Sequence, residues 1–134
     1  MSPGNFRWNK IKPSFTYPVL WIIISTVLLT IPGNDLPQEN WLNDIWFDKW
    51  VHIGMFSIMV TLWCWSLQKK TSDGKHLSNI YLWTGLACLV YGAGMEFVQK
   101  YFIPNRSFDV NDIIADGFGC SLGVIYATRK FIKK

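Results

Sequence analysis

Four long apolar stretches, almost free of charged residues, constrain what this chain can fold into. They cover roughly residues 17–31, 51–67, 80–97 and 110–131. Each stretch approaches the ~20 apolar residues that an α-helix needs to cross a bilayer, whereas buried helices of soluble proteins carry runs of only ~10–14. The pattern predicts an all-α, polytopic membrane protein.

The length of 134 residues fits a single domain, residues 1–134, built as a four-transmembrane-helix bundle. The predicted helices are about 15–32, 49–68, 77–99 and 110–131. Tryptophans gather at the ends of the apolar stretches, as at Trp63 and Trp65. Such clusters are typical of the aromatic belts at membrane–water interfaces.

The distribution of Lys and Arg predicts the orientation, because cytoplasmic loops are enriched in positive residues. Ten of the thirteen lie in the N-terminal segment, the second loop and the C-terminal tail. The other three are Lys49, Lys100 and Arg106. We therefore expect both termini in the cytoplasm. The net charge of +4 then reflects topology, and it gives no reason to invoke nucleic acid as a partner.

Cysteines and histidines point to no familiar cofactor. All three cysteines lie within apolar stretches, no CxxC motif occurs, and we expect no disulfide. The two histidines, His52 and His76, fall on opposite sides of the predicted membrane, which argues against a bis-histidine haem. No zinc-ligand spacing occurs, so the sequence assigns no metal ligand, and the cofactor and oligomeric state stay open.

Polar side chains within the apolar helices carry the functional information, because such residues are expensive in a bilayer. Asp48 and His52 are four residues apart on the second helix and share a face. The third and fourth helices each combine a polar stripe at the outer end with small residues further in. The stripe residues are Gly85, Cys88, Gly92, Glu96 and Gln99 on the third helix, and Asp109, Asp112, Asp116, Gly119 and Gly123 on the fourth.

Two expectations follow from these stripes. Gly119 and Gly123 should pack against the third helix near Gly85 and Gly92, since small residues allow close approach of membrane helices. The polar groups should converge on one outward-facing pocket, in a binding or catalytic role. Its predicted residues are Asp48, Lys49, His52, Glu96, Gln99, Arg106, Asp109, Asp112 and Asp116.

Each polar group also has a structural interpretation. Asp48, Asp109 and Asp112 can cap helices, where carboxylates favour the N-terminus. Asp116 lies too deep for a cap but can form an interhelical ion pair or hydrogen bond, as can His52. Arg106 can anchor at the interface or pair with the acids. The excess of acid over base means that the pocket must hold protons, bind a cation or stay hydrated.

The ordered set of motifs resembles the VanZ-like membrane proteins over most of the chain. The matching pieces are Pro32-Gly33 with Pro37, Asp48-Lys49-Trp50-Val51-His52 with Phe56, Glu96-Phe97-Val98-Gln99, Arg106-Ser107-Phe108-Asp109-Val110-Asn111-Asp112, and Gly117-Phe118-Gly119 with Gly123. Asp116 departs from the pattern, which more often carries Asn. The resemblance implies a multi-pass protein of the bacterial cytoplasmic (inner) membrane. It also implies a link to antibiotic resistance, because the founding member is associated with resistance to teicoplanin, a lipid-tailed glycopeptide that inhibits cell-wall synthesis.

Several functions fit these residues. The first is a cell-envelope protein that binds membrane lipids, a lipid-linked envelope intermediate or a lipoglycopeptide in its outer pocket. The second is a membrane-embedded enzyme acting on an envelope lipid or head group, by acid–base chemistry or with Mg²⁺ or Ca²⁺. The third is a small transporter with Glu96 as proton carrier. The sequence predicts no particular reaction.

Overall fold

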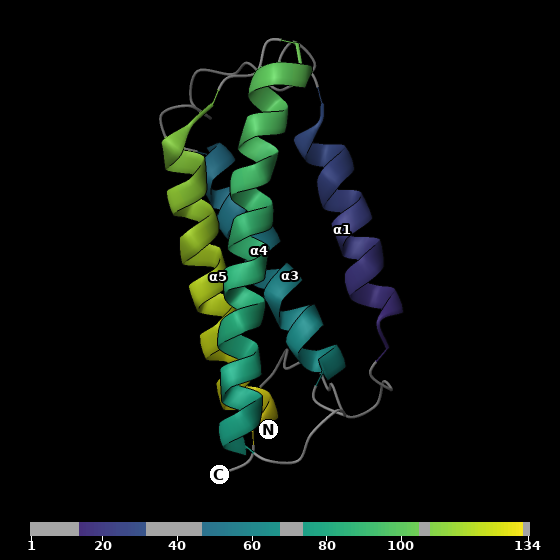
Figure 1. Cartoon of the computed structure of the whole chain (residues 1–134), viewed down its shortest axis with the longest axis vertical. Coiled ribbons are helices and arrows are strands. Elements are labelled where there is room, and N and C mark those ends of the chain that lie inside the picture. The colour runs from purple at the N-terminus through teal and green to yellow at the C-terminus, as the bar shows by residue number, and fades with distance from the viewer. Residues whose placement is uncertain (1–13, 32–46, 68–73, 105–107, 133–134) are drawn as a thin grey trace.

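Helices are the only regular secondary structure in the described part of the chain, in line with the predicted all-α class. The structure is a computed structural model that describes residues 14–31, 47–67, 74–104 and 108–132. Its helices are α1 (Thr16–Leu29), α3 (Phe47–Leu67), α4 (Gly74–Phe102) and α5 (Val110–Phe131). They alternate in direction, so α1 begins and α5 ends at the lower end of the bundle (Figure 1).

The helix boundaries follow the apolar stretches, with polar groups fixing the ends. Asp109 is the N-cap of α5, and its side chain accepts a hydrogen bond from the Asn111 N–H. Arg129 and Lys130 occupy the last turn of α5, where cations complement the helix dipole. Hydroxyl groups inside the apolar helices bond to carbonyls one turn back, as Thr61 does to Ser57, so they add few unsatisfied groups.

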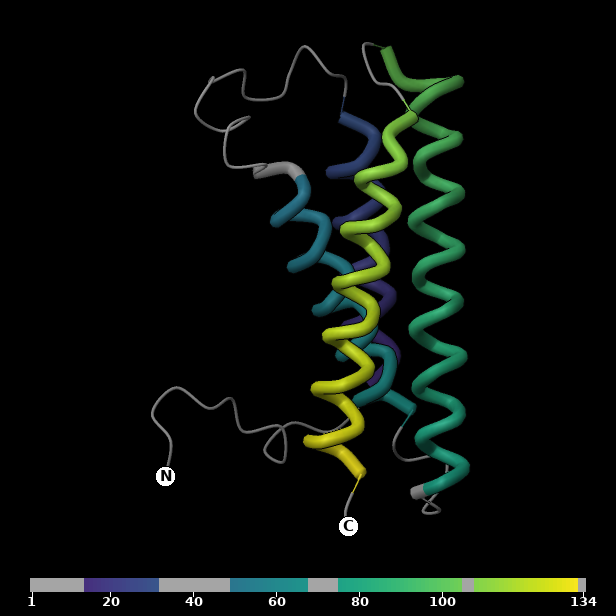
Figure 2. Tube along the Cα trace, turned by 90° about the vertical axis from the view of Figure 1, so that its left-hand side faces the viewer, coloured from purple at the N-terminus to yellow at the C-terminus, as the bar shows by residue number. Residues whose placement is uncertain are grey.

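The central packing unit is α3 against α5, with α4 alongside. α3 lies obliquely to α4, as the two perpendicular views show (Figures 1 and 2). The core contains buried side chains from these helices, among them Phe56, Met59, Val60, Tyr81 and Cys120. All three cysteines are buried and free.

α1 completes the bundle through a few specific contacts. The indole Nε1 of Trp21 donates to the Met55 carbonyl on α3 at 3.0 Å. The hydroxyls of Thr26 and Tyr91 lie 2.7 Å apart, which ties α1 to α4. With only 14 residues, α1 is ~21 Å long, shorter than the ~30 Å hydrocarbon core of a bilayer.

Within the described residues, two helices are long and apolar enough to cross a membrane by length and composition. They are Lys49–Leu67 and Lys75–Phe102, with mean hydropathies of 1.4 and 1.2. α1 is apolar but shorter than this, and α5 carries Asp112 and Asp116 near one end and Arg129 and Lys130 near the other. The predicted four crossings are therefore supported directly for two helices.

Candidate functional site

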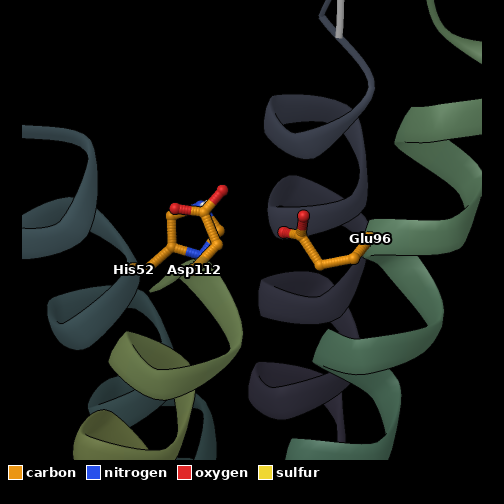
Figure 3. Close-up of side chains that lie close together, drawn as sticks. All are labelled: His52, Glu96 and Asp112. Atoms are coloured by element: carbon orange, nitrogen blue, oxygen red, sulfur yellow. Dashed lines mark ion pairs between the residues drawn. The ribbon is translucent and has the colours of Figure 1, made fainter. Parts of the chain in front are cut away.

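Three helices bring one histidine and two carboxylates to the same place. His52 lies near the start of α3, Asp112 in the first turn of α5, and Glu96 near the end of α4. All three are buried, and one potential ligand atom from each lies within 4.8 Å of the other two. Figure 3 shows the Glu96 carboxylate directed from α4 towards the His52 ring and Asp112. The structure therefore brings these three predicted residues together, and their role in a pocket stays a prediction.

Asp116 holds the imidazole of His52 in place. Its Oδ1 lies 2.6 Å from Nδ1 of His52, and because a carboxylate accepts, the Nδ1–H donates. The bond leaves Nε2 as the free nitrogen, 3.9 Å from Oδ2 of Asp112. Phe56, one turn along α3, lies nearly parallel to the His52 ring, with the ring centroids 6.3 Å apart and an interplanar angle of 11°. These contacts hold the ring in position, and an ionised Asp116 carboxylate favours the tautomer with its proton on Nδ1.

Lys49 links the two carboxylates at the start of α5. Its Nζ lies 2.6 Å from Oδ2 of Asp109 and 2.7 Å from Oδ1 of Asp112. Burial disfavours the charged form of Asp109. Hydrogen bonds from Lys49 and from the Asn111 N–H outweigh it, and they hold the pKa of the Asp109 carboxyl below its ordinary value. Asp109 is thus both a helix cap and an ion-pair partner.

Glu96 joins the same network through the backbone. Its Oε2 accepts a hydrogen bond from the Asp109 N–H at 3.0 Å. This contact connects the C-terminal part of α4 to the N-cap of α5, and only 1% of the Glu96 surface is exposed. We call Lys49, His52, Glu96, Asp109, Asp112 and Asp116 the polar cluster.

The polar cluster carries more acid than base. Among the residues that the structure describes, its four carboxylates face one ammonium group, together with His52. That leaves a formal charge of −3, or −2 with His52 protonated. Buried charge of one sign is tolerated only with protons, counter-ions or water, so the cluster is suited to a cation or to a ligand that brings one.

Other residues predicted for the pocket have different outcomes. Gln99 turns to α1, where its Nε2 donates to the Leu29 carbonyl at 2.8 Å rather than to a member of the cluster. Arg106 and the side chain of Asp48 lie outside the described residues. Phe56 was part of the family pattern but was not assigned to the site. Its signal was the spacing of four residues from His52, which places both on one face of α3.

The prediction for the glycines was wrong in one respect. A Cβ on Gly119 would lie 2.5 Å from the Ile53 carbonyl oxygen, and one on Gly123 would lie 2.8 Å from Cβ of Val60. Both glycines therefore face α3, not α4. A Cβ on Gly85 would meet Val124 of α5, and one on Gly92 would meet the Asp116 carboxylate and Phe56. All four glycines allow close approach: Gly119 and Gly123 between α3 and α5, and Gly85 and Gly92 between α4 and α5.

Comparisons with known proteins place the chain in a family. An uncharacterized protein, C11E3.10, of the fission yeast Schizosaccharomyces pombe is 32% identical over 138 residues, which cover 99% of this chain and 76% of the relative. No solved structure matches the chain. The sequence profile of the VanZ/LLP1 family matches residues 7–132, which confirms the resemblance seen in the motifs: the chain belongs to the VanZ/LLP1 family.

Proposed function

We propose that this chain is a multi-pass membrane protein that binds the polar head of a lipid-linked or lipid-tailed molecule at the polar cluster. One observation carries the proposal: charged groups from α3, α4 and α5 are gathered and buried near one end of the bundle. Polar groups at such a depth are costly and commonly mark sites of function.

The outer surface of the bundle supports a lipid environment. Large apolar side chains are exposed along α1, α4 and α5, including Ile23, Val27, Val90, Phe118 and Leu122. Soluble monomers rarely expose contiguous apolar surface on this scale. Apolar residues outside and ionisable residues inside reverse the arrangement of a soluble bundle, as expected when lipid surrounds the helices.

The alternating helices and the Lys/Arg bias together support four crossings with both termini in the cytoplasm. Lys75, Arg129 and Lys130 lie at the end of the bundle opposite the polar cluster. With that orientation, the cluster lies in the outer part of the bilayer, where head groups of the outer leaflet reach it. Placement in a bacterial cytoplasmic membrane, and a role in teicoplanin susceptibility, follow from the family resemblance.

Ligand retention by the purified protein tests the proposal. The protein is extracted in mild detergent, and lipids that remain bound are identified by native mass spectrometry. Teicoplanin and phosphate-headed lipids are then added as probes. Glu96→Gln and Asp112→Asn should lose the bound molecule, whereas Lys100→Gln, an exposed change on α4, should retain it. Equal retention by all four proteins would contradict a head-group site in the cluster.

A membrane enzyme is the second candidate, and the His52–Asp116 pair favours it. An imidazole oriented by a carboxylate is a common general base, and the free Nε2 faces Asp112. The two functions differ in outcome: an enzyme converts the retained lipid over time, and His52→Ala stops the conversion. Unchanged lipid after prolonged incubation with the wild type supports binding alone.

A further inference from the structure

We propose that His52, Glu96 and Asp112 form a binding site for a divalent transition-metal ion. The ligands would be Nε2 of His52 and one oxygen from each carboxylate, and one potential ligand atom of each residue lies within 4.8 Å of the other two. The ion site rests on geometry alone. Its part in holding a head group rests on the proposed function.

Each candidate ligand is held by a contact made through its other polar atom. Nδ1 of His52 is bonded to Asp116, Oδ1 of Asp112 to Lys49, and Oε2 of Glu96 to the Asp109 N–H. Metal sites are built in this way, because partners outside the ligands orient them and fix the histidine tautomer. The carboxylate–histidine arrangement in particular leaves Nε2 deprotonated and able to bind a metal. Helix capping or simple ion pairing would not require all three side chains to be oriented by a second hydrogen-bond partner.

A second observation points to a missing positive charge. Asp116 is 1% exposed, and its Oδ2 is buried without a hydrogen-bond partner. The cluster already has a formal surplus of acid among the described residues. A divalent ion at His52 Nε2 would neutralise most of that surplus and, through the imidazole, stabilise the charge on Asp116.

The donor set indicates which ions fit. Imidazole suits Zn²⁺ and other transition ions, whereas Mg²⁺ and Ca²⁺ prefer oxygen ligands alone. Ligands about 2.1 Å from one tetrahedral ion lie roughly 3.4 Å apart, so side chains separated by up to 4.8 Å must close by as much as roughly 1.4 Å. Three protein ligands leave a coordination position open. An oxygen of a phosphate or carboxylate head group can occupy this open position. The ion would then allow the acidic cluster to bind an anionic head group.

Zn²⁺ binding to the purified full-length protein tests the site. After treatment with EDTA, isothermal titration with Zn²⁺ should show one site per chain, with Mg²⁺ and Ca²⁺ binding far more weakly. The chain has two histidines, and His76 is exposed at the start of α4, so His76→Ala is the matched control for His52→Ala. Removing one ligand by His52→Ala or Asp112→Asn should weaken Zn²⁺ binding at least ~100-fold, and His76→Ala should leave it unchanged.

Asp116 is a positioning residue in this scheme. Asp116→Asn should weaken Zn²⁺ binding by ~10–100-fold, the usual effect of losing a partner of a ligating histidine. It should also shift the visible absorption of bound Co²⁺, a readout that general destabilisation does not change. Circular dichroism and size-exclusion chromatography in detergent establish that each variant is folded before titration.

The outcomes separate the ion site from the proposed function. Zn²⁺ binding that is lost in folded His52→Ala supports the site, even if no lipid is retained. Retention of a phosphate-headed lipid that is insensitive to EDTA and to His52→Ala supports the function but overturns the part assigned to the ion. Equal Zn²⁺ affinity in the wild type and folded His52→Ala overturns the ion site itself.

Discussion

Nδ1 of His52 lies 2.6 Å from Oδ1 of Asp116, and the two side chains are 7% and 1% exposed. The pair joins α3 to α5, and Gly92 of α4 lies beside it. A Cβ on Gly92 would meet the second oxygen of Asp116. A glycine thus makes room for a buried carboxylate, and the carboxylate orients a histidine.

Removing the Asp116 carboxylate should destabilise the metal-free protein. Asp116→Ala leaves a buried N–H of His52 without a partner, which costs about 1–3 kcal/mol. Asp116→Asn keeps an acceptor oxygen and should cost less. The melting temperature in detergent with EDTA measures both, and Ser121→Ala, an exposed change on the same helix, serves as control. A wild-type melting temperature for Asp116→Ala would mean that the pair contributes little to stability.

Gly119→Ala should lower the yield and melting temperature of the folded protein. Its Cβ would contact the Ile53 backbone on α3, which cannot move without separating the two helices. Overpacking of this kind costs about 1–3 kcal/mol or more. Gly94→Ala is the matched control, since nothing lies within 4 Å of its Cβ and alanine favours a helix. Equal effects of the two substitutions would show that the α3–α5 interface tolerates expansion.

The sequence predicts the helices and the meeting of His52, Glu96 and Asp112 for a simple physical reason. Long apolar stretches fix the helices, and similar depths near their ends place these groups at one level. The helical period of 3.6 residues then places each of these three residues on the polar face of its helix. A ligand set spread over three helices has no short spacing motif, so its metal-site geometry emerges only in the fold.

The errors come from what a single-helix pattern cannot determine. Small residues indicate close approach but not the neighbour, so Gly119 and Gly123 were assigned to α4 although they face α3. Gln99 follows Glu96 by three residues, which rotates it about 60° away around the helix axis. That difference is enough to turn it from the cluster to the Leu29 carbonyl on α1.

Reporter fusions should place both ends of the chain in the cytoplasm. The prediction rests on the excess of Lys and Arg in the terminal segments and second loop, and on the alternating directions of the four described helices. A fusion after residue 134 should report a cytoplasmic location, and an insertion within residues 34–46 the opposite side. The same compartment for both positions would reject four crossings.

Gln99→Leu should loosen the end of α1. The Gln99 amide donates to the Leu29 carbonyl, one of the last carbonyls of α1 that lack a partner within their own helix. Losing this buried hydrogen bond should cost about 1–3 kcal/mol. Hydrogen–deuterium exchange should rise in the last turn of α1 and stay unchanged in the middle of α5. A uniform increase over all helices would instead mean that Gln99 supports the whole bundle.

Lys49 should be coupled more strongly to Asp112 than to Asp109. Both carboxylates lie within 2.7 Å of its ammonium group, but the Asp112 side chain is 10% exposed and that of Asp109 is 36%. Solvent screens the more exposed pair, and surface ion pairs contribute only ~0–1 kcal/mol. Breaking a more deeply buried pair leaves an uncompensated charge.

Two double-mutant cycles measure this difference. Lys49→Met is combined with Asp112→Asn in one cycle and with Asp109→Asn in the other, and stability is followed in detergent with EDTA. Coupling between contacting residues usually falls between ~0.5 and 3 kcal/mol, and the Asp112 cycle should give the larger value. Lys49→Met alone should be the most destabilising single change, because it removes the ammonium group that pairs with both Asp109 and Asp112. Neutralising Asp112 should then recover part of the loss. A larger coupling for Asp109, or no recovery, would show that Lys49 mainly anchors Asp109, the N-cap of α5, rather than acting as the counter-charge of the buried cluster.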